Sequence, residues 1–413
     1  MRRRQFSLGA IAVAVASLAV ACTASSSSMP SGSLARVTEP ASSAAATSGN
    51  GAPSPASGPV AVYAHAGAGM LSAEASKARA LVYVPNSQSN TVDVIDQRTF
   101  KIVGHFGVGA LPQHVVPSWN LRTLWVNGDK GNNLVPINPR TGKPGKPVPV
   151  ADPYNLYFSP DGKHALVMAE ALHRLDIRNS TTMKLERSLP VPCAGLNHAD
   201  FTADGSVMLV SCEFSGKLLV IPTSFTHIAA QIDLNHRLTP NQPTGSMITM
   251  MSAGNVEPGA TAMPQDVRLT PNGKFFVVAD MLRGGIWVID AAHPRIVRFV
   301  PTGRGAHGVY PSRDASVLYV TNRGAGSISV VDAKTLKVRT VWHLPGGGSP
   351  DMGGVSADGT KLWLSGRYNG VVYVISTKNG ALLHKILVGS GPHGLAVWPQ
   401  PGRISLGHTG NMR

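Results

Sequence analysis

Polar side chains recur along this chain at the start of one apolar segment after another. Seven such positions are separated by 41, 43, 68, 41, 44 and 42 residues. Four of them are histidines and two are carboxylates, which are the side chains that most often move protons and bind metals in proteins. They are His114, Asn155, His198, Asp266, His307, Asp351 and His393. If the repeated segments fold alike, these rim residues occupy equivalent positions and meet around one opening.

Three interpretations of the rim residues are open. They can bind a polar ligand or an anion, or they can serve only to bond backbone groups of neighbouring repeats. They can also bind zinc, copper, iron or nickel. The sequence leaves the cofactor open, with copper or a haem as the candidates. The candidate metal ligands are His114, His198, His307 and His393. Ligands that share one ion must lie about 2.0–2.1 Å from it, and residues of adjacent repeats can be too far apart for that at the axis. A metal site would therefore need an off-axis pair between two repeats, such as His307 with His393 or His114.

A second set of polar residues follows the second apolar segment of each repeat and is expected on the same face. The set is Asn86, Asp129, Glu170, Glu213, Asp280, Arg323 and Arg367. The two arginines belong to neighbouring repeats and can grip a carboxylate or phosphate. The alternative is a salt bridge to Asp280 or Asp351. We therefore predict a ligand site made of the rim residues together with Arg323 and Arg367, and we assign no catalytic residue.

Two cysteines and an insertion lie near this face. Cys193 and Cys212 belong to the repeat of His198, and outside the cytoplasm a disulfide between them is expected, with a reduced pair or a soft metal site as the alternatives. The one long interval indicates an insertion at residues 235–262, which carries Met247, Met250 and Met251. These thioethers can hold Cu(I) or fill apolar gaps, and the loop can cover the opening.

The elements that must position these residues are short strands. Turn sequences that suit tight hairpins recur, as in Ser159-Pro160-Asp161-Gly162 and Thr270-Pro271-Asn272-Gly273. Alternating strands such as Ile286-Trp287-Val288-Ile289-Asp290 follow them. A period in the low forties with four strands per unit predicts a β-propeller. Seven rim residues bound six complete units, so strands at the two ends of the repeat region are expected to share a seventh blade.

The residues Tyr319-Val320-Thr321-Asn322, with the variant Tyr83-Val84-Pro85-Asn86, resemble the name motif of the YVTN-repeat (YncE-like) propellers. The resemblance covers about residues 78–413 and implies an all-β, seven-bladed β-propeller. Related rings include the haem-binding domain of the cytochrome-type nitrite reductase, lactonases, copper-dependent thiol oxidases and plain binding proteins. The resemblance therefore implies a fold and leaves the function open.

The first 22 residues have the pattern of an export signal. Arg3-Arg4-Gln5-Phe6 resembles the twin-arginine motif, and a 14-residue apolar run at residues 8–21 is too short to span a bilayer. Ala19-Val20-Ala21-Cys22 resembles a lipobox, which predicts acylation of Cys22; an ordinary signal with plain cleavage is the alternative. Residues 23–77 are rich in Ser, Ala, Gly and Pro and are predicted to form a flexible tether, followed by the propeller at residues 78–413.

Composition excludes several classes of protein. Hydrophobic residues make up 43% of 413 residues, so the chain is not wholly disordered. There is no Gly-x-Ser-x-Gly elbow, phosphate loop, His-Glu-x-x-His or Cys-x-x-Cys-His motif. A net charge of +15 suits anionic lipid headgroups or acidic envelope polymers, and no nucleic-acid platform is present. We expect a monomeric, lipid-anchored envelope protein, periplasmic or on the outer surface, that binds a small ligand or partner protein. A metal- or haem-dependent oxidoreductase is the alternative, and a lactonase is a third.

Overall fold

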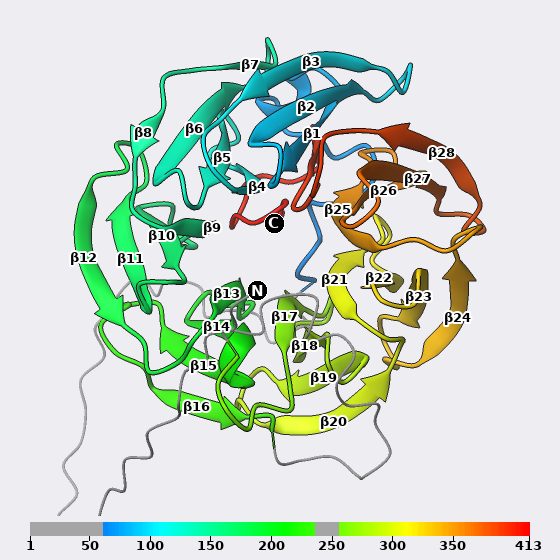
Figure 1. The fold of residues 1–413 in the computed structure, drawn as a ribbon. Helices are drawn as coiled ribbons and strands as arrows, with labels where there is room; N and C mark the ends of the chain where they lie inside the picture. The colour runs from blue at the N-terminus through cyan, green and yellow to red at the C-terminus, as the bar shows by residue number, and fades with distance from the viewer. Residues whose placement is uncertain (1–60, 236–255) are drawn as a thin grey trace, which may run out of the picture. The chain divides into compact units, whose positions relative to one another are not determined.

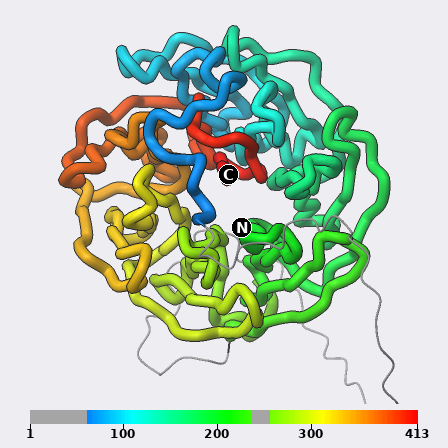
Figure 2. Tube along the Cα trace, turned by 180° about the vertical axis from the view of Figure 1, so that it is seen from behind, coloured from blue at the N-terminus to red at the C-terminus, as the bar shows by residue number. Residues whose placement is uncertain are grey.

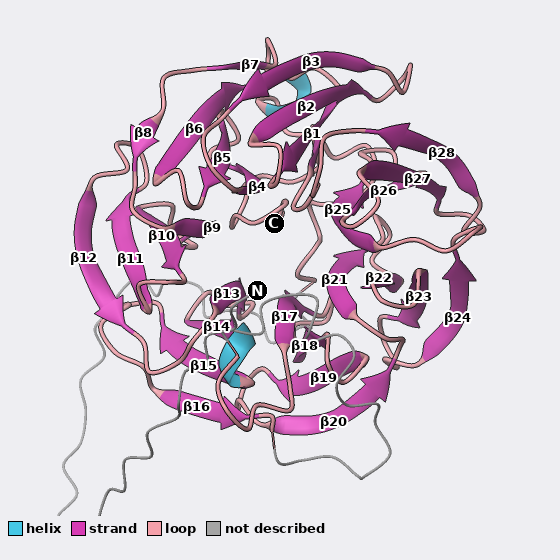
Figure 3. Ribbon diagram, viewed as in Figure 1, coloured by secondary structure: helices cyan, strands magenta, loops and turns pink. Residues whose placement is uncertain are grey.

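The computed structural model describes residues 61–235 and 256–413. Within these residues, seven antiparallel sheets form a ring around one axis (Figure 1). The helices among them are the single turns η1 (Ala75–Lys77) and η2 (Glu213–Ser215), and almost everything else is strand or loop (Figure 3). The expected all-β, seven-bladed propeller is thus confirmed. Cys22, most of the tether and the three insertion methionines lie outside the described residues.

Each blade has an inner strand at the axis, followed outward by the other strands of its sheet. From the inner strand outward, blade 1 contains β4 (Pro112–Pro117), β5 (Leu124–Gly128), β6 (Asn133–Asn138), β7 (Lys143–Pro144) and β8 (Val148–Pro149). Blade 2 contains β9 (Pro153–Phe158), β10 (His164–Ala169), β11 (Arg174–Asn179) and β12 (Leu185–Pro190). Blade 3 contains β13 (Leu196–Phe201), β14 (Val207–Cys212), β15 (Lys217–Pro222) and β16 (Ala230–Asp233).

The second half of the ring repeats this order. Blade 4 contains β17 (Pro264–Leu269), β18 (Phe275–Asp280), β19 (Gly285–Asp290) and β20 (Ile296–Pro301). Blade 5 contains β21 (Ala306–Pro311), β22 (Val317–Asn322), β23 (Ser327–Asp332) and β24 (Val338–His343). Blade 6 contains β25 (Pro350–Val355), β26 (Lys361–Gly366), β27 (Val371–Ser376) and β28 (Leu382–Leu387).

Blade 7 closes the ring with strands from both ends of the repeat region. Its inner strand β29 (Ala396–Trp398) pairs with β1 (Leu81–Asn86), so that Leu81 faces Trp398 and Tyr83 faces Ala396. The outer strands are β2 (Thr91–Asp96) and β3 (Ile102–Gly107). This pairing confirms the shared blade and removes the sheet edges that an open ring would expose.

A break in strand register aims the rim residues at the axis. On β4 the pairing with β5 is interrupted between Pro112 and Val115, and His114 lies in that interval. The same shift surrounds the rim residue on β13, β17, β21 and β25. Such bulges release a side chain from the pleat and re-aim it. The re-aimed side chains are closely packed at the axis, since a Cβ on Gly394 would overlap the ring of His114.

Residues 61–77, which we placed in the tether, belong to the folded part. Val62, Tyr63, Ala66 and Ala75 are buried in the same apolar cluster as strand residues of blades 1, 3, 4 and 7. Tyr63 donates a hydrogen bond to the carbonyl of Leu269 at 2.7 Å, on inner strand β17. The tether prediction is therefore wrong for this segment, because its few bulky residues bury enough apolar surface to order it.

The chain also continues beyond the closing strand. Residues 399–413 turn back into the central opening, where Figure 2 shows them beside the segment that begins at residue 61. The tail runs along β9, with the N–H of Phe158 bonded to the carbonyl of Leu406 at 3.0 Å and the N–H of His408 to the carbonyl of Leu156 at 2.9 Å. Gly407 allows this approach, because its φ is +105° and a Cβ would lie 2.5 Å from the carbonyl oxygen of Leu156. The sequence prediction did not include this tail.

Apolar clusters fill the spaces between neighbouring blades, as between blades 2 and 3 and between blades 5 and 6. The polar axis is therefore surrounded by an apolar shell.

In the described ranges, no helix has the length and hydropathy needed to cross a bilayer.

The contact of Tyr63 tests whether the N-terminal segment contributes to stability. Tyr63→Phe removes one buried hydrogen bond, so the free energy of unfolding should fall by about 1 kcal/mol. Tyr319→Phe is the matched control, because no hydrogen bond of its hydroxyl to the described residues is present. Chemical denaturation measures both, and an unchanged stability in Tyr63→Phe would show that the segment is only loosely attached.

Candidate functional site

All seven rim residues lie at the axis, and each is at most 2% exposed. The rings of His114 and His393 have centroids 5.0 Å apart, and those of His307 and His393 are 5.7 Å apart. His198 lies 5.4 Å from His114 and 6.2 Å from His307. The four predicted histidines therefore form one cluster, which is buried and not an open ring of side chains.

The tail adds a fifth histidine that the repeat pattern missed. His408 is fully buried, and its ring centroid lies 4.7 Å from that of His198 and 5.2 Å from that of His114. It belongs to no repeat, so no spacing identifies it. The only signal in the sequence is a histidine in a Gly-rich segment just after the last blade. We call His114, His198, His307, His393 and His408 the histidine cluster.

Hydrogen bonds fix which ring nitrogen carries the proton in three members of the cluster. His114 Nδ1 lies 3.0 Å from the carbonyl of Tyr154, so Nδ1–H donates and Nε2 is the bare nitrogen. Asn155 Nδ2 lies 3.1 Å from His198 Nδ1 and 3.2 Å from His408 Nδ1. The N–H of Leu156 bonds to Asn155 Oδ1 at 2.9 Å, which orients the amide. Asn155 therefore donates to both rings and leaves hydrogen on their Nε2 atoms.

Four polar atoms beside Asn155 have no hydrogen-bond partner among residues 61–235 and 256–413. They are Nε2 of His114, His198 and His408, and Oδ1 of Asp266. Asp266 Oδ1 is 3.7 Å from His408 Nε2. Two of these atoms donate and two accept, which is the complement that one buried water needs. Without such a molecule each buried atom would cost about 1–3 kcal/mol.

The candidate cofactors copper and haem fit this cluster poorly. One ligand nitrogen from each of His114, His198 and His408 lies within 4.8 Å of the others, which suits a metal in composition. However, an ion would have to displace two Nε2 protons and reverse the amide of Asn155. A haem would need to separate rings that already pack within about 6 Å of one another. His307 and His393 lie outside the close group of three nitrogens and contact Asp351.

Asp351 joins three of the predicted site residues. Arg323 Nε donates to its Oδ1 at 2.9 Å, His393 Nδ1 lies 2.7 Å from its Oδ2, and His307 Nδ1 lies 3.3 Å from Oδ1. Burial would raise the pKa of Asp351, but the charge of Arg323 outweighs it and holds the pKa below its usual value. The salt bridge we listed as the alternative for Arg323 is thus present, and Arg323 is not a free anion receptor.

A cavity of about 180 Å³ opens above the cluster on the face that carries the second set of polar residues. We call it the top-face cavity. Its lining consists of Leu111, Gln113, Asp129, Lys130, Tyr154, Glu170, Glu213, Phe214, His307, Arg323, Arg367 and His393. Of the second set, Asn86 and Asp280 are not in this lining; Asp280 accepts instead from the indole of Trp287 at 2.8 Å. The cavity is smaller than the ~300 Å³ typical of drug-sized ligands.

One wall of this cavity carries carboxylates. Asp129, Glu170 and Glu213 follow the second strands of blades 1, 2 and 3, and we call them the acidic wall. Burial raises the pKa of Asp129 to about 6. The neighbouring Asp152 adds to this rise, and the charge of Lys130 opposes it. Burial and the neighbouring Glu213 raise the pKa of Glu170 well above its usual value, and burial raises that of Glu213. Lys130 Nζ lies 3.6 Å from Asp129 Oδ1, whereas Glu170 and Glu213 have no ion pair within 4.0 Å among the described residues.

The opposite wall carries guanidinium groups. Arg323 and Arg367 follow the second strands of blades 5 and 6. Arg367 Nη1 donates to Ser87 Oγ at 3.0 Å and to the carbonyl of Gly391 at 3.2 Å. Within the described part of the chain, no carboxylate lies within 4.0 Å of Arg367. The cavity thus has charges of opposite sign on its two sides.

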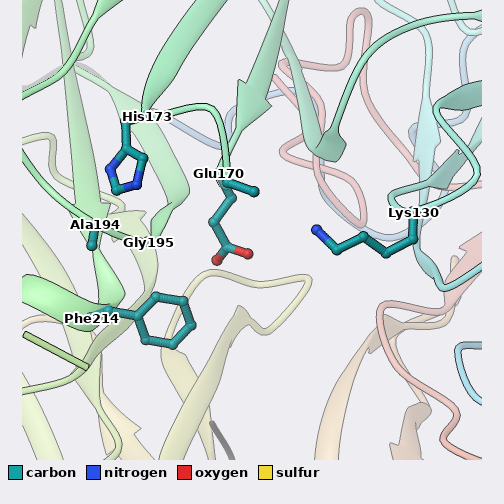
Figure 4. Close-up of a pocket in the computed structure, with 7 residues that line it drawn as sticks. Lys130, Glu170, His173, Ala194, Gly195 and Phe214 are labelled. Carbon is teal, nitrogen blue, oxygen red and sulfur yellow. The ribbon is translucent and has the colours of Figure 1, made fainter. Parts of the chain in front are cut away.

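A second pocket of about 300 Å³ adjoins the acidic wall and shares Lys130, Glu170 and Phe214 with the top-face cavity. Figure 4 shows the carboxylate of Glu170 pointing into it, between the amine of Lys130 and the ring of Phe214. A disulfide joins Cys193 to Cys212. Because Ala194 and Glu213 directly follow these cysteines, the disulfide holds the pocket wall and one acidic residue in place.

The ends of the insertion are held together beside this face. The N–H of Thr261 bonds to Asn235 Oδ1 at 2.8 Å, and its hydroxyl bonds to the carbonyl of Asn235 at 2.6 Å. The N–H of Glu257 bonds to the carbonyl of Phe214 at 2.9 Å. The insertion therefore starts and ends near the acidic wall.

The histidine cluster makes stability depend on pH. Burial lowers the pKa of His114 to about 4, whereas a solvated imidazole titrates near 6.5. Between these values only the unfolded chain binds the proton, so stability falls as the pH drops from about 6.5 to about 4. His114→Gln should remove the share of this one imidazole and flatten the slope by up to about 1.4 kcal/mol per pH unit. Urea unfolding at several pH values measures it, with the exposed His227→Gln as control; parallel slopes would contradict the buried neutral state.

The fold has relatives among solved structures. A functionally unknown protein from Desulfotomaculum acetoxidans is 16% identical and matches over 78% of this chain and 99% of its own, with a TM-score of 0.59. The dihydro-heme d1 dehydrogenase NirN is 15% identical over 77% of this chain and 75% of its own, with a TM-score of 0.54. A putative 6-phosphogluconolactonase from Bacteroides uniformis is 16% identical over 76% and 98%, with a TM-score of 0.54. At 15–16% identity, these similarities show a shared fold and nothing further.

In sequence, no curated protein matches this chain. The profile of the YncE-like β-propellers matches residues 44–186 and 252–401, which is most of the chain and includes six of the seven rim residues and both cavity arginines. The chain therefore belongs to the YncE-like β-propeller family.

Proposed function

We propose that this protein is an exported, lipid-anchored propeller that binds a small polar ligand in its top-face cavity. The observation that carries the proposal is the pair of oppositely charged walls facing one small cavity. Buried charges cost free energy unless they are paired. Charges held apart by the ring, with room between them, favour a site that is completed by a ligand over one that serves stability alone.

Sequence features support the proposed export and membrane attachment. The twin-arginine-like and lipobox-like segments predict export and acylation at Cys22, and the composition of residues 23–60 predicts a tether after the acylated cysteine. The net charge of +15 suits anionic headgroups or acidic envelope polymers as additional partners. A partner protein at the same face is an alternative to a small ligand.

The enzymatic alternatives have weaker support. NirN is described as a dihydro-heme d1 dehydrogenase, but a haem fits poorly among the packed rings of the histidine cluster. A lactonase needs a hard cation held by oxygen ligands, and among the described residues the only close metal-binding group consists of histidines. Ligand binding without chemistry therefore has the best support.

A thermal-shift screen of small polar metabolites tests the binding function. At least one compound should raise the melting temperature of the full chain, because a ligand that binds only the folded state stabilises it. The shift should shrink in Arg367→Gln, which alters the cavity, and persist in Arg98→Gln, which alters an exposed turn. Shifts that Arg367→Gln leaves intact would place binding elsewhere and contradict the proposal.

Acylation is tested by Cys22→Ser. This variant lacks the thiol that would carry the lipid, so the protein should lose palmitate labelling and move from the membrane to the soluble fraction. Thr23→Ala, one residue further along, should retain both. Continued labelling of Cys22→Ser would show that the lipobox assignment is wrong.

A further inference from the structure

We propose that the top-face cavity binds a small zwitterion, with its carboxylate on Arg367 and its ammonium group at Glu170 and Glu213. This inference rests on the proposed function and narrows it to one class of ligand. It is argued from the charges that the fold leaves without partners.

The three groups concerned lack ion pairs. No oppositely charged side chain lies within 4.0 Å of Arg367, Glu170 or Glu213 among the described residues. Glu170 Oε1 is buried and without a hydrogen-bond partner among them, and Glu213 accepts from the amide of Asn197. An arginine and two glutamates in one small cavity would ordinarily pair with one another.

The ring prevents that pairing. The two glutamates lie on blades 2 and 3 and Arg367 lies on blade 6, on the other side of the axis. Asp351, whose charge acts on both arginines, is already bonded to Arg323 and His393. Arg367 consequently remains as the guanidinium that faces the cavity without a carboxylate.

Charge complementarity then selects the ligand. An anion alone would satisfy Arg367 and leave the acidic wall uncompensated, and a cation alone would do the reverse. Arg367 is held through Nη1 by Ser87 and Gly391, while its Nε and Nη2 make no hydrogen bond to any described residue, so they can take a carboxylate as a fork. Tyr154, in the same lining, can donate or accept a further hydrogen bond.

Volume limits the ligand to a small molecule. A cavity of about 180 Å³ holds on the order of six waters, at ~30 Å³ for each in the liquid. Short amino acids with one amine and one carboxylate are of this size. The distance between their charges can be varied by adding methylene groups, so the chain length that binds best measures the separation of the two charged walls.

Binding should release protons. The groups that face Glu170 are Glu213, Asp129 and Asp152, with Lys130 as the one cation, and burial with Glu213 raises the pKa of Glu170 well above its usual value. An ammonium group placed beside Glu170 favours its ionised form, so ligand binding should lower this pKa and release protons wherever the group is partly protonated.

Isothermal titration calorimetry of the full chain, purified in detergent, tests the proposal with glycine, β-alanine and 4-aminobutanoate. At least one should bind, and butanoate and butylamine should bind roughly tenfold to a hundredfold more weakly, as expected for loss of a charged hydrogen bond. Titrations in two buffers of different ionisation enthalpy should show proton release. Arg367→Gln and Glu170→Gln should each weaken binding by a similar factor, and Arg367→Lys by less.

Matched controls separate a local effect from misfolding. Arg98→Gln and Glu186→Gln change exposed groups and should leave affinity unchanged, and the melting temperature of each variant without ligand checks its fold. If butanoate or butylamine binds as tightly as the amino acids, the zwitterion proposal is overturned while the binding function stands. Failure of all three amino acids also overturns it, and the metabolite screen then decides the binding function separately.

Discussion

One carboxylate, Asp351, determines which charge is left over at the top of the propeller. It contacts Arg323 and His307 from blade 5 and His393 from the segment leading into blade 7, so it ties three consecutive blades together at the axis. Because it serves these groups, it is not available to Arg367 at ion-pair distance. The unpaired guanidinium of the cavity is therefore a consequence of how the blades are joined.

Beneath the cavity, five imidazoles are buried together, and this is stable only while they are neutral. Burial lowers the pKa of each member, and the charges of neighbouring arginines and histidines add to the effect for most of them. The tail that carries His408 closes the opening along β9, and Asn155 sets the protonated nitrogen of His198 and His408. The histidine cluster thus lies at the bottom of the top-face cavity, and hydrogen bonds fix the orientation of its rings.

The sequence predicted the repeated elements of the fold well and missed two segments that occur once. Turn motifs and a period in the low forties identified seven blades and placed His114 or Asp351 at equivalent positions, because each blade must present one residue to the axis. His408 and Tyr63 lie in segments that occur once, so no periodicity reveals them. The sequence offered a salt bridge of the arginines to Asp280 or Asp351 as an alternative, but only the folded ring shows that Asp351 takes Arg323 and leaves Arg367.

A crystal structure of the full chain with a bound short amino acid tests the central claim most directly. We predict density in the top-face cavity, with the ligand carboxylate at hydrogen-bond distance from Arg367 and its amine at Glu170 or Glu213. A ligand in the reverse orientation, or one bound on the outer strands while only water fills the cavity, would contradict the account.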